Sequence, residues 1–243
     1  MNFLQKLFAK TKKPTKPYCS ALIAAAGSSN RMGGENKLLL PLCGKPVIVH
    51  TLLAIDRSEL VDEIIIATRE EDLLTYADLC KTHGITKPVK VVIGGASREE
   101  SVLRAAMEAN EQATLLAVQD GARPMVTPEL IDKVIKKARE CNAAAPAIPV
   151  HDTIKVAADG IVMSTPDRST LYAVQTPQVF DAQLLRAALQ SAVENHAPIT
   201  DDCSAVERLG KQVYLTEGSQ DNFKITTPLD MILAQAIMER RGE

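Results

Sequence analysis

Near the start of the sequence, residues 22–37 combine an apolar run with a small-residue loop that carries Arg31 and Lys37. Residues 24–27 are alanines and a glycine, so a ligand can approach the main chain closely there. Backbone N–H groups in such a turn can point into one concavity and bind an anion, beside which Arg31 and Lys37 add positive charge. The pattern predicts a phosphate-binding loop, and the alternative is a surface turn with two solvated basic residues.

Three more charged residues stand where they could act on a phosphorylated ligand. Asp120 directly follows an apolar run, so its carboxylate could hold a divalent cation between phosphates; alternatively, it bonds its own turn. Arg123 could grip a phosphate or brace the loop that contains it. Lys224 precedes a predicted helix N-cap at residues 226–228, and the alternative is a solvated surface lysine.

Several other chemistries find no support in the sequence. The four histidines show no metal-ligand spacing, no Ser-His-Asp or Cys-His arrangement is present, and the GxxxxGK[ST] phosphate loop is missing. The five cysteines are scattered without a CxxC pair, which favours free thiols in a reducing, cytoplasmic compartment over disulfides or zinc. Phosphate handling by dispersed Arg and Lys side chains, together with a metal ion, is the chemistry that remains.

Composition indicates an ordinary globular protein of 243 residues, with 46% hydrophobic and 24% charged residues. A net charge of −2 and only 3% aromatic residues argue against a nucleic-acid partner. No apolar run is long enough for a transmembrane helix, so no integral membrane association is expected. Residues 1–18 are interpreted as a basic flexible extension and not as a signal peptide. A weak contact of this amphipathic segment with a membrane surface or partner is the alternative.

The elements that must position these residues alternate regularly along the chain. Short apolar runs predict strands at residues 21–25, 63–67, 90–93, 114–118 and 143–148. Amphipathic stretches predict helices at residues 47–57, 70–82, 99–109 and 128–141, the last with Thr127 as N-cap. This alternation predicts an α/β fold with a doubly wound, mostly parallel, Rossmann-like sheet. The loops at residues 24–37, 94–95 and 120–124 then meet at one edge of that sheet, where ligands bind.

The alternation of predicted strands and helices is interrupted after Pro149. Residues 153–157 and 161–164 flank an Asp-Gly turn and predict a β-hairpin. This arm, at about residues 150–178, is too small to bury a core of its own, which favours packing against another subunit. Further elements are then expected in the order helix, helix, strand, helix at residues 182–195, 202–209, 212–216 and 228–240. We therefore predict a single domain over residues 19–243 with a protruding β-arm used in dimerisation.

Nine motifs stand in order along the chain. The first four are residues 25–27, 31–32 with Lys37, 94–95 with Ser101, and 120–124. The other five are residues 152–155, 167–168, 176–178, 200–202 and 222–226. In this order and at near-family spacing, they resemble the sugar-phosphate cytidylyltransferases, most of all those that act on 2-C-methyl-D-erythritol 4-phosphate. The resemblance implies transfer of CMP from CTP to the polyol phosphate, with release of diphosphate, in non-mevalonate isoprenoid synthesis.

The same resemblance implies roles for individual residues. Arg31 and Lys37 would stabilise charge on the α-phosphate and the leaving group, and Arg168 and Lys224 would hold the acceptor phosphate as part of the catalytic set. The implied nucleotide-binding residues are Ala25, Ala26, Gly27, Gly95, Ser101, Asp120 and Arg123. The implied acceptor-binding residues are Thr153, Arg168, Thr176 and Lys224.

A metal ion and a second subunit are implied as well. The triphosphate calls for Mg²⁺, with Asp120 and Asp221 as its candidate ligands. In the family the arm crosses to the other subunit of a homodimer, so Thr153 and Arg168 would serve the partner's site.

The sequence departs from the family pattern at a few positions. Ser29 and Leu38 replace a usual glycine and glutamine, Ala96 and Gly121 replace a frequent Asp and Ala, and the path from Arg31 to Lys37 is one residue shorter. None of these changes removes a charged group assigned to catalysis. Two alternatives remain: a ribitol-5-phosphate cytidylyltransferase, or a silent nucleotide-binding regulatory member, which would not need all of these charged residues.

Overall fold

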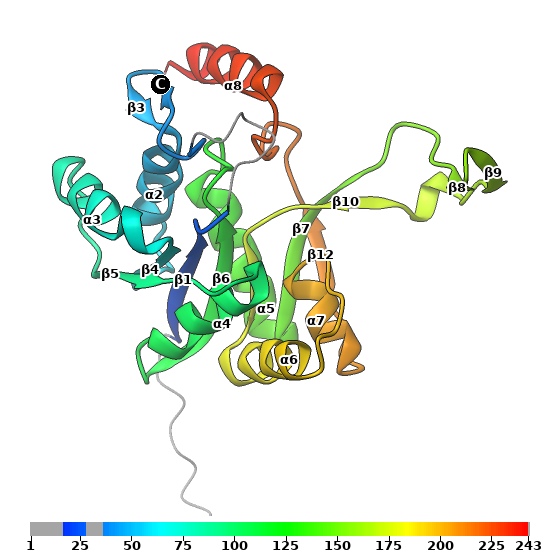
Figure 1. Ribbon diagram of the computed structural model, residues 1–243, viewed down its shortest axis with the longest axis horizontal. Helices are drawn as coiled ribbons and strands as arrows, with labels where there is room; N and C mark the ends of the chain where they lie inside the picture. Colours follow the sequence, from blue (N-terminus) through cyan, green and yellow to red (C-terminus); the bar gives the residue numbers. More distant parts are fainter. Residues whose placement is uncertain (1–16, 28–35, 243) are drawn as a thin grey trace, which may run out of the picture.

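The computed structural model describes residues 17–27 and 36–242. Residues 1–16, which make up most of the expected basic extension, lie outside the described part. So do residues 28–35, which include Ser29 and the predicted catalytic Arg31. In the described part, a central sheet is covered by helices on both faces, and one arm projects from it (Figure 1).

The central sheet is mostly parallel, as the alternating sequence pattern predicts. Four neighbouring parallel strands form one half, in the order β6 (Ala113–Asp120), β1 (Tyr18–Ala24), β4 (Glu63–Thr68) and β5 (Val89–Ile93). The other half contains β7 (Ala143–Pro149) with β12 (Tyr214–Glu217) parallel to it. The five strands expected before the arm, and the one expected at residues 212–216, all form with shifts of a few residues at their ends.

Two antiparallel strands have no counterpart among the expected elements. Strand β11 (Gln178–Asp181) lies between β6 and β7 and pairs with both, and β10 (Tyr172–Val174) pairs with the far end of β7. The chain between them contains the cis Thr176–Pro177 peptide. Both strands are too short for a recognisable alternation, and pairing with distant strands is what makes them extended.

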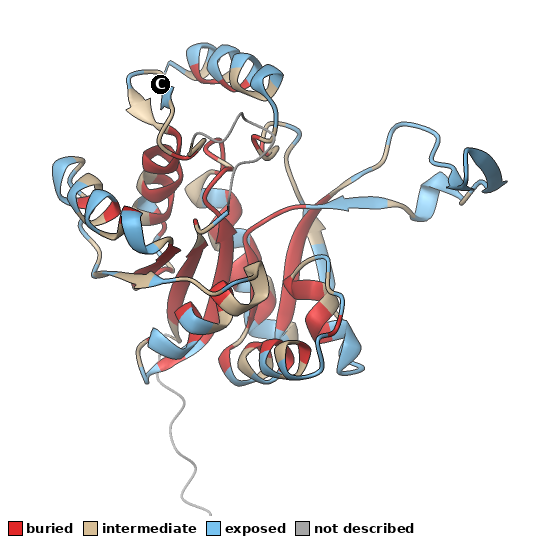
Figure 2. Cartoon of the chain, viewed as in Figure 1, coloured by how far each residue is buried: buried red, intermediate tan, exposed pale blue. Residues whose placement is uncertain are grey.

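Strands that are apolar on both faces explain the two-sided core. In β1, Ile23 packs into one core cluster and Leu22 into the other, because successive side chains point to opposite faces. One face is covered by helices α2 (Val47–Arg57), α3 (Leu73–Thr82) and α5 (Pro128–Cys141), and α8 (Pro228–Arg241) adds Ala234 and Met238 to the same core cluster. The other face is covered by α4 (Arg98–Glu108), α6 (Ala182–Glu194) and α7 (Asp202–Arg208). Figure 2 shows the buried residues concentrated in the sheet and on the inward faces of these helices.

Shorter elements complete the fold. A 3₁₀ turn, η2 (Glu70–Asp72), precedes α3, so the helix expected over residues 70–82 is divided in two. Strands β2 (Pro41–Leu42) and β3 (Lys45–Pro46) form a small hairpin before α2. The expected N-cap of α5 is present, since the Thr127 hydroxyl accepts a hydrogen bond from the Leu130 N–H.

The arm extends away from the sheet (Figure 1). At its end, β8 (Val156–Ala158) and β9 (Ile161–Ser164) form a hairpin whose turn residues Asp159 and Gly160 both have positive φ. A second 3₁₀ turn, η3 (Arg168–Thr170), lies on the way back. Apolar side chains of the hairpin are exposed, with Ile161 and Met163 each 68% accessible. Across residues 17–27 and 36–242, no helix has the length and apolar character needed to cross a membrane.

Candidate functional site

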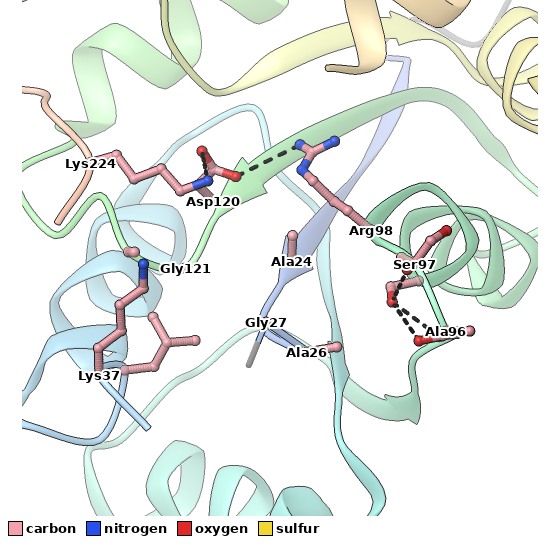
Figure 3. A pocket seen from close by; sticks show the side chains of 14 residues that line it. Ala24, Ala26, Gly27, Lys37, Ala96, Ser97, Arg98, Asp120, Gly121 and Lys224 are labelled. Carbon is pink, nitrogen blue, oxygen red and sulfur yellow. Dashed lines mark hydrogen bonds and ion pairs between the residues drawn. The ribbon is translucent and has the colours of Figure 1, made fainter. Parts of the chain in front are cut away.

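A cavity of about 330 Å³ opens at the carboxyl edge of the parallel strands, within the size range of small-molecule sites. Its lining comes from the loops after β1, β5 and β6, from the start of α4, and from the loop before α8 (Figure 3). The described lining residues are Ala24, Ala26, Gly27, Lys37, Leu38, Gly95, Ala96, Ser97, Arg98, Ser101, Asp120, Gly121, Ala122 and Lys224. The three predicted loops therefore converge on one cavity.

One side of the cavity is made by the glycine loop after β5 and the first turn of α4. The Ser101 hydroxyl accepts a hydrogen bond from the Gly95 N–H at 3.0 Å and donates to the Ser97 carbonyl at 2.8 Å. A Cβ added at Gly94 would lie 2.8 Å from both the Ala26 Cβ and the Ser101 Oγ. Glycine at this position thus lets the loop close against the end of β1. The result is a small-residue wall on which the main chain is accessible.

A cluster of charges around Asp120 forms the floor of the cavity. Its Oδ2 lies 3.1 Å from Lys224 Nζ and 3.4 Å from Arg123 Nε, and its Oδ1 lies 3.7 Å from an Arg98 guanidinium nitrogen. Burial pushes the pKa of the Asp120 carboxyl upward, but the charges of Lys224, Arg98 and Arg123 outweigh it and lower the pKa below the usual value. Asp120 is therefore ionised at neutral pH, surrounded by positive charge.

Arg98 is a cavity residue that our sequence reasoning missed. It follows the α4 N-cap, Ser97, and bonds the fully buried carboxylate of Asp202 at 2.7 Å while it also faces Asp120. Burial raises the pKa of Asp202 in spite of the arginine, and its Oδ1 has no partner among the described residues. The sequence did contain a signal for Arg98, namely a basic residue three positions after Gly95. The start of a helix after a glycine loop is a common anion site, so a basic residue there could have been added to the predicted site.

Two lysines reach the cavity from separate segments of the chain. Lys224 lies in the loop before α8, and this loop is tied to the β6 loop because the Ile225 N–H donates to the Ala122 carbonyl at 2.8 Å. Lys37 lies in the turn at residues 36–39, and its Nζ donates to the Ile225 carbonyl at 2.8 Å. The structure therefore brings the predicted catalytic residues Lys37 and Lys224 together. Arg31 lies outside the described residues.

Most of the predicted nucleotide-binding residues line the cavity, namely Ala26, Gly27, Gly95, Ser101 and Asp120. Ala25 does not, because it is buried in the core and its N–H donates to the Ala67 carbonyl. Arg123 does not line the cavity either. Its guanidinium donates to the Asn222 carbonyl at 2.6 Å and pairs with Asp120, so of its two predicted roles the structure favours bracing the loop.

Predicted acceptor and metal residues are more dispersed. Thr176 is buried behind the cavity, where its hydroxyl accepts a hydrogen bond from the Asp120 N–H. Thr153 and Arg168 are exposed on the arm, where Arg168 donates to the His151 carbonyl. Asp221 does not join Asp120 in the cavity, because Arg240 and Arg241 of α8 hold its carboxylate at 2.8 and 2.9 Å.

Comparisons with known proteins agree with this geometry. A family model described as IspD: 2-C-methyl-D-erythritol 4-phosphate cytidylyltransferase matches residues 19–240. A 2-C-methyl-D-erythritol 4-phosphate cytidylyltransferase from Bacillus cytotoxicus is 44% identical over 218 residues, covering 89% of this chain and 96% of the relative. A protein of the same name from Syntrophotalea carbinolica is 42% identical, covering 91% and 97%.

Solved structures give the same result. A crystal structure of 4-diphosphocytidyl-2C-methyl-D-erythritol synthase from Anaerococcus prevotii superposes with a TM-score of 0.84 at 31% identity, covering 92% of this chain and 97% of that one. A 2-C-methyl-D-erythritol 4-phosphate cytidylyltransferase from Thermus thermophilus superposes with a TM-score of 0.74 at 31% identity, covering 91% and 99%.

Proposed function

The chain belongs to the 2-C-methyl-D-erythritol 4-phosphate cytidylyltransferase family, and we propose that it joins the CMP group of CTP to 2-C-methyl-D-erythritol 4-phosphate. The products are 4-diphosphocytidyl-2-C-methyl-D-erythritol, an intermediate of isoprenoid synthesis, and diphosphate. One observation carries the assignment: Lys37, Lys224 and Arg98 reach a single cavity around Asp120, opposite a wall of small residues.

The transfer needs an in-line displacement at the α-phosphorus. An oxygen of the acceptor phosphate forms the new P–O bond while the bond to the β-phosphate oxygen breaks, and diphosphate leaves with the electron pair. Positioning and neutralisation of charge do most of the work in such a step. Lys37 stabilises charge on the α-phosphate and the leaving group, and we assign Arg31 to the same task. Lys224, whose ammonium group pairs with Asp120, holds the acceptor phosphate.

The small-residue wall suits the cytidine part of the substrate. Ala26, Gly95 and Ser101 leave the main chain accessible, so the base is read by backbone groups and not by large side chains. The positive end of α4, which begins at Arg98, points its backbone N–H groups toward the same region. In this proposal the nucleotide lies between the glycine loop and Lys37.

The donor set also fits Mg²⁺ that is carried largely by the triphosphate. Asp120 is the one acidic side chain among the described residues that line the cavity, and the described chain has no group of three or more His, Cys, Asp or Glu side chains that could hold a metal ion. Mg²⁺ commonly binds through one or two carboxylates together with substrate phosphates. Asp120 would be its protein ligand, and the ion would neutralise triphosphate charge.

The arm supports a proposal about assembly. Thr153 and Arg168 lie on a projection that extends away from the sheet, and its hairpin exposes apolar side chains. We propose that the arm packs against a second copy, so that these residues serve the partner's acceptor site in a homodimer. We also propose a cytoplasmic location, because the free cysteines suit a reducing compartment.

An acceptor assay tests the function directly. The full chain is incubated with CTP, Mg²⁺ and either 2-C-methyl-D-erythritol 4-phosphate or ribitol 5-phosphate, and diphosphate release is followed. Release with the methylerythritol phosphate and little with ribitol phosphate supports the proposal. Release only with ribitol phosphate reassigns the acceptor, and no release with either refutes the transferase. Lys224→Ala should raise the KM for the acceptor, whereas Lys211→Ala, at an exposed lysine outside the cavity, serves as the matched control.

A further inference from the structure

Asn36, the residue before Lys37, is tied to helix α3 by hydrogen bonds of the asparagine side chain. The Asn36 Nδ2 donates to Asp72 Oδ2 at 2.9 Å and to the Tyr76 hydroxyl at 3.2 Å. On its other side, the Asn36 Oδ1 accepts a hydrogen bond from the Leu38 N–H at 3.2 Å. Both ends of the amide are therefore engaged, which fixes the plane of this side chain and the start of the turn that follows.

The groups that receive Asn36 are themselves firmly held. Asp72 is 7% exposed, and its Oδ2 also accepts hydrogen bonds from Arg69 Nε and Nη2, at 2.9 and 2.7 Å. Tyr76 is fully buried in the core, and burial raises its pKa to about 12, so its hydroxyl keeps its proton at neutral pH. We call Asn36, Asp72 and Arg69 the Asn36 anchor.

The Asn36 anchor acts on the main chain that carries Lys37. The Leu39 N–H donates to the Asn36 carbonyl at 2.9 Å, so the turn over residues 36–39 is closed directly at the anchor. From that turn the Lys37 side chain reaches across to the Ile225 carbonyl and into the cavity. A long lysine side chain has many rotamers, and fixing its backbone origin restricts where its ammonium group can lie.

None of the three anchor residues is among the described residues that line the cavity. They share no contact with Asp120 or Lys224 in the described interactions, and α3 packs on the face of the sheet opposite α4. In the described part of the chain, the anchor is joined to two cavity residues, Lys37 through the chain itself and Leu38 through the hydrogen bond to Asn36 Oδ1. Of the two, Lys37 carries the charged group to which the proposed transfer assigns a role.

We propose that the Asn36 anchor is a positioning device for Lys37 in the cytidylyl transfer. The proposal rests on the function proposed above, since Lys37 is assigned there to the α-phosphate and the leaving group. Misplacement of a catalytic group by about 1 Å can cost on the order of a hundredfold in rate. Loss of the anchor should therefore lower kcat substantially and change the KM values less.

A double-mutant cycle separates positioning from a merely structural role. The variants are Asn36→Ala, Lys37→Ala and both together, each assayed as the full chain by diphosphate release. We expect Asn36→Ala to lower kcat about tenfold or more, and Lys37→Ala about a hundredfold or more. Because the anchor works through Lys37, the double variant should be no slower than Lys37→Ala alone. If the kcat of the double variant is lowered by the product of the two single losses, the proposal is wrong. An unchanged kcat for Asn36→Ala would overturn it as well.

Two further variants keep the test decisive. Asp72→Asn preserves shape while it removes the charge that orients Asn36 and Arg69, and it replaces Asn36→Ala in the cycle if that variant does not fold. Asn195→Ala is the matched control, because the described hydrogen bonds of this exposed side chain go only to Ser191 of α6. If the unmodified protein releases no diphosphate, the proposed function fails; if it is active and the losses multiply, only the anchor proposal fails.

Discussion

Gly94→Ala tests whether the nucleotide side of the cavity is built by close packing of small residues. An added Cβ would lie 2.8 Å from the Ala26 Cβ and 2.8 Å from the Ser101 Oγ. Carbon atoms in contact prefer about 3.5–4.0 Å, so the walls must separate by about 0.7 Å or more. The loop cannot simply lift away, because the Gly94 N–H donates to the Thr68 carbonyl at 2.7 Å and the Gly94 carbonyl accepts from Arg104.

The expected size of the effect follows from this geometry. Overpacking of this kind costs about 1–3 kcal/mol in the free energy of unfolding. In a chain of this length each kcal/mol lowers Tm by about 2–4 °C, so Tm should fall by about 2–12 °C. The same displacement moves Gly95 and Ser101 out of place, so the KM for CTP should rise about tenfold or more. The KM for the acceptor should change little, because Lys224 belongs to the loop before α8, which is tied to the β6 loop and not to the glycine loop.

Thermal unfolding and steady-state kinetics measure these effects. The double variant Gly94→Ala/Ala26→Gly moves one methyl group and removes one of the two short contacts. It should recover part of the lost Tm and part of the CTP affinity, since only the contact with Ser101 remains. A Gly94→Ala protein with unchanged Tm and KM for CTP would refute the reasoning, and so would a double variant that recovers nothing.

The remaining predictions concern the arm and the charge cluster. Mixed Arg168→Ala and Lys37→Ala subunits should regain part of the activity if each site is shared across a dimer, and a mixture as inactive as its components argues against a crossing arm. Asp120→Asn should raise the Mg²⁺ concentration for half-maximal activity at least about tenfold, and Asp221→Asn should raise it far less. A larger increase for Asp221→Asn would identify Asp221 as the metal ligand in place of Asp120. Because the pKa of Asp120 is lowered, its contribution to stability is present above its ordinary value of 3.8 and is lost as pH falls through the folded pKa. The difference in unfolding free energy between the parent and Asp120→Asn should therefore shrink from pH 6 to pH 3, and a constant difference contradicts the assignment.

Local patterns in the sequence were enough for most of the fold. Runs that are apolar on both faces predict buried parallel strands, and the structure confirms those around Ile23, Ile65 and Val118. Thr127 followed by Pro128 predicts the start of α5, which the structure confirms. These signals succeed because they depend on neighbours a few residues apart. Since parallel strands present their carboxyl ends at one edge, the convergence of the three loops also follows from the sequence.

Tertiary structure decided what depends on contacts between distant segments. The insertion of β11 between β6 and β7 carries no local signature, because four residues acquire their conformation from two partners elsewhere in the chain. Arg98 and Asp202 are 104 positions apart, and the packing of α4 and α7 against α6 brings them together. Asp221 is a further example. The sequence predicted it as a metal ligand beside Asp120, but its carboxylate pairs with Arg240 and Arg241 and does not line the cavity.

The sequence by itself therefore predicted which residue types could handle phosphate, and it determined at which edge of the sheet they gather. The structure decided which of them share the cavity and which brace it from behind, as Arg123 and the Asn36 anchor do. The physical reason is that a charged side chain acts through what lies within a few ångströms of it. That neighbourhood is set by the register and order of strands far apart in the chain, and not by its neighbours in sequence.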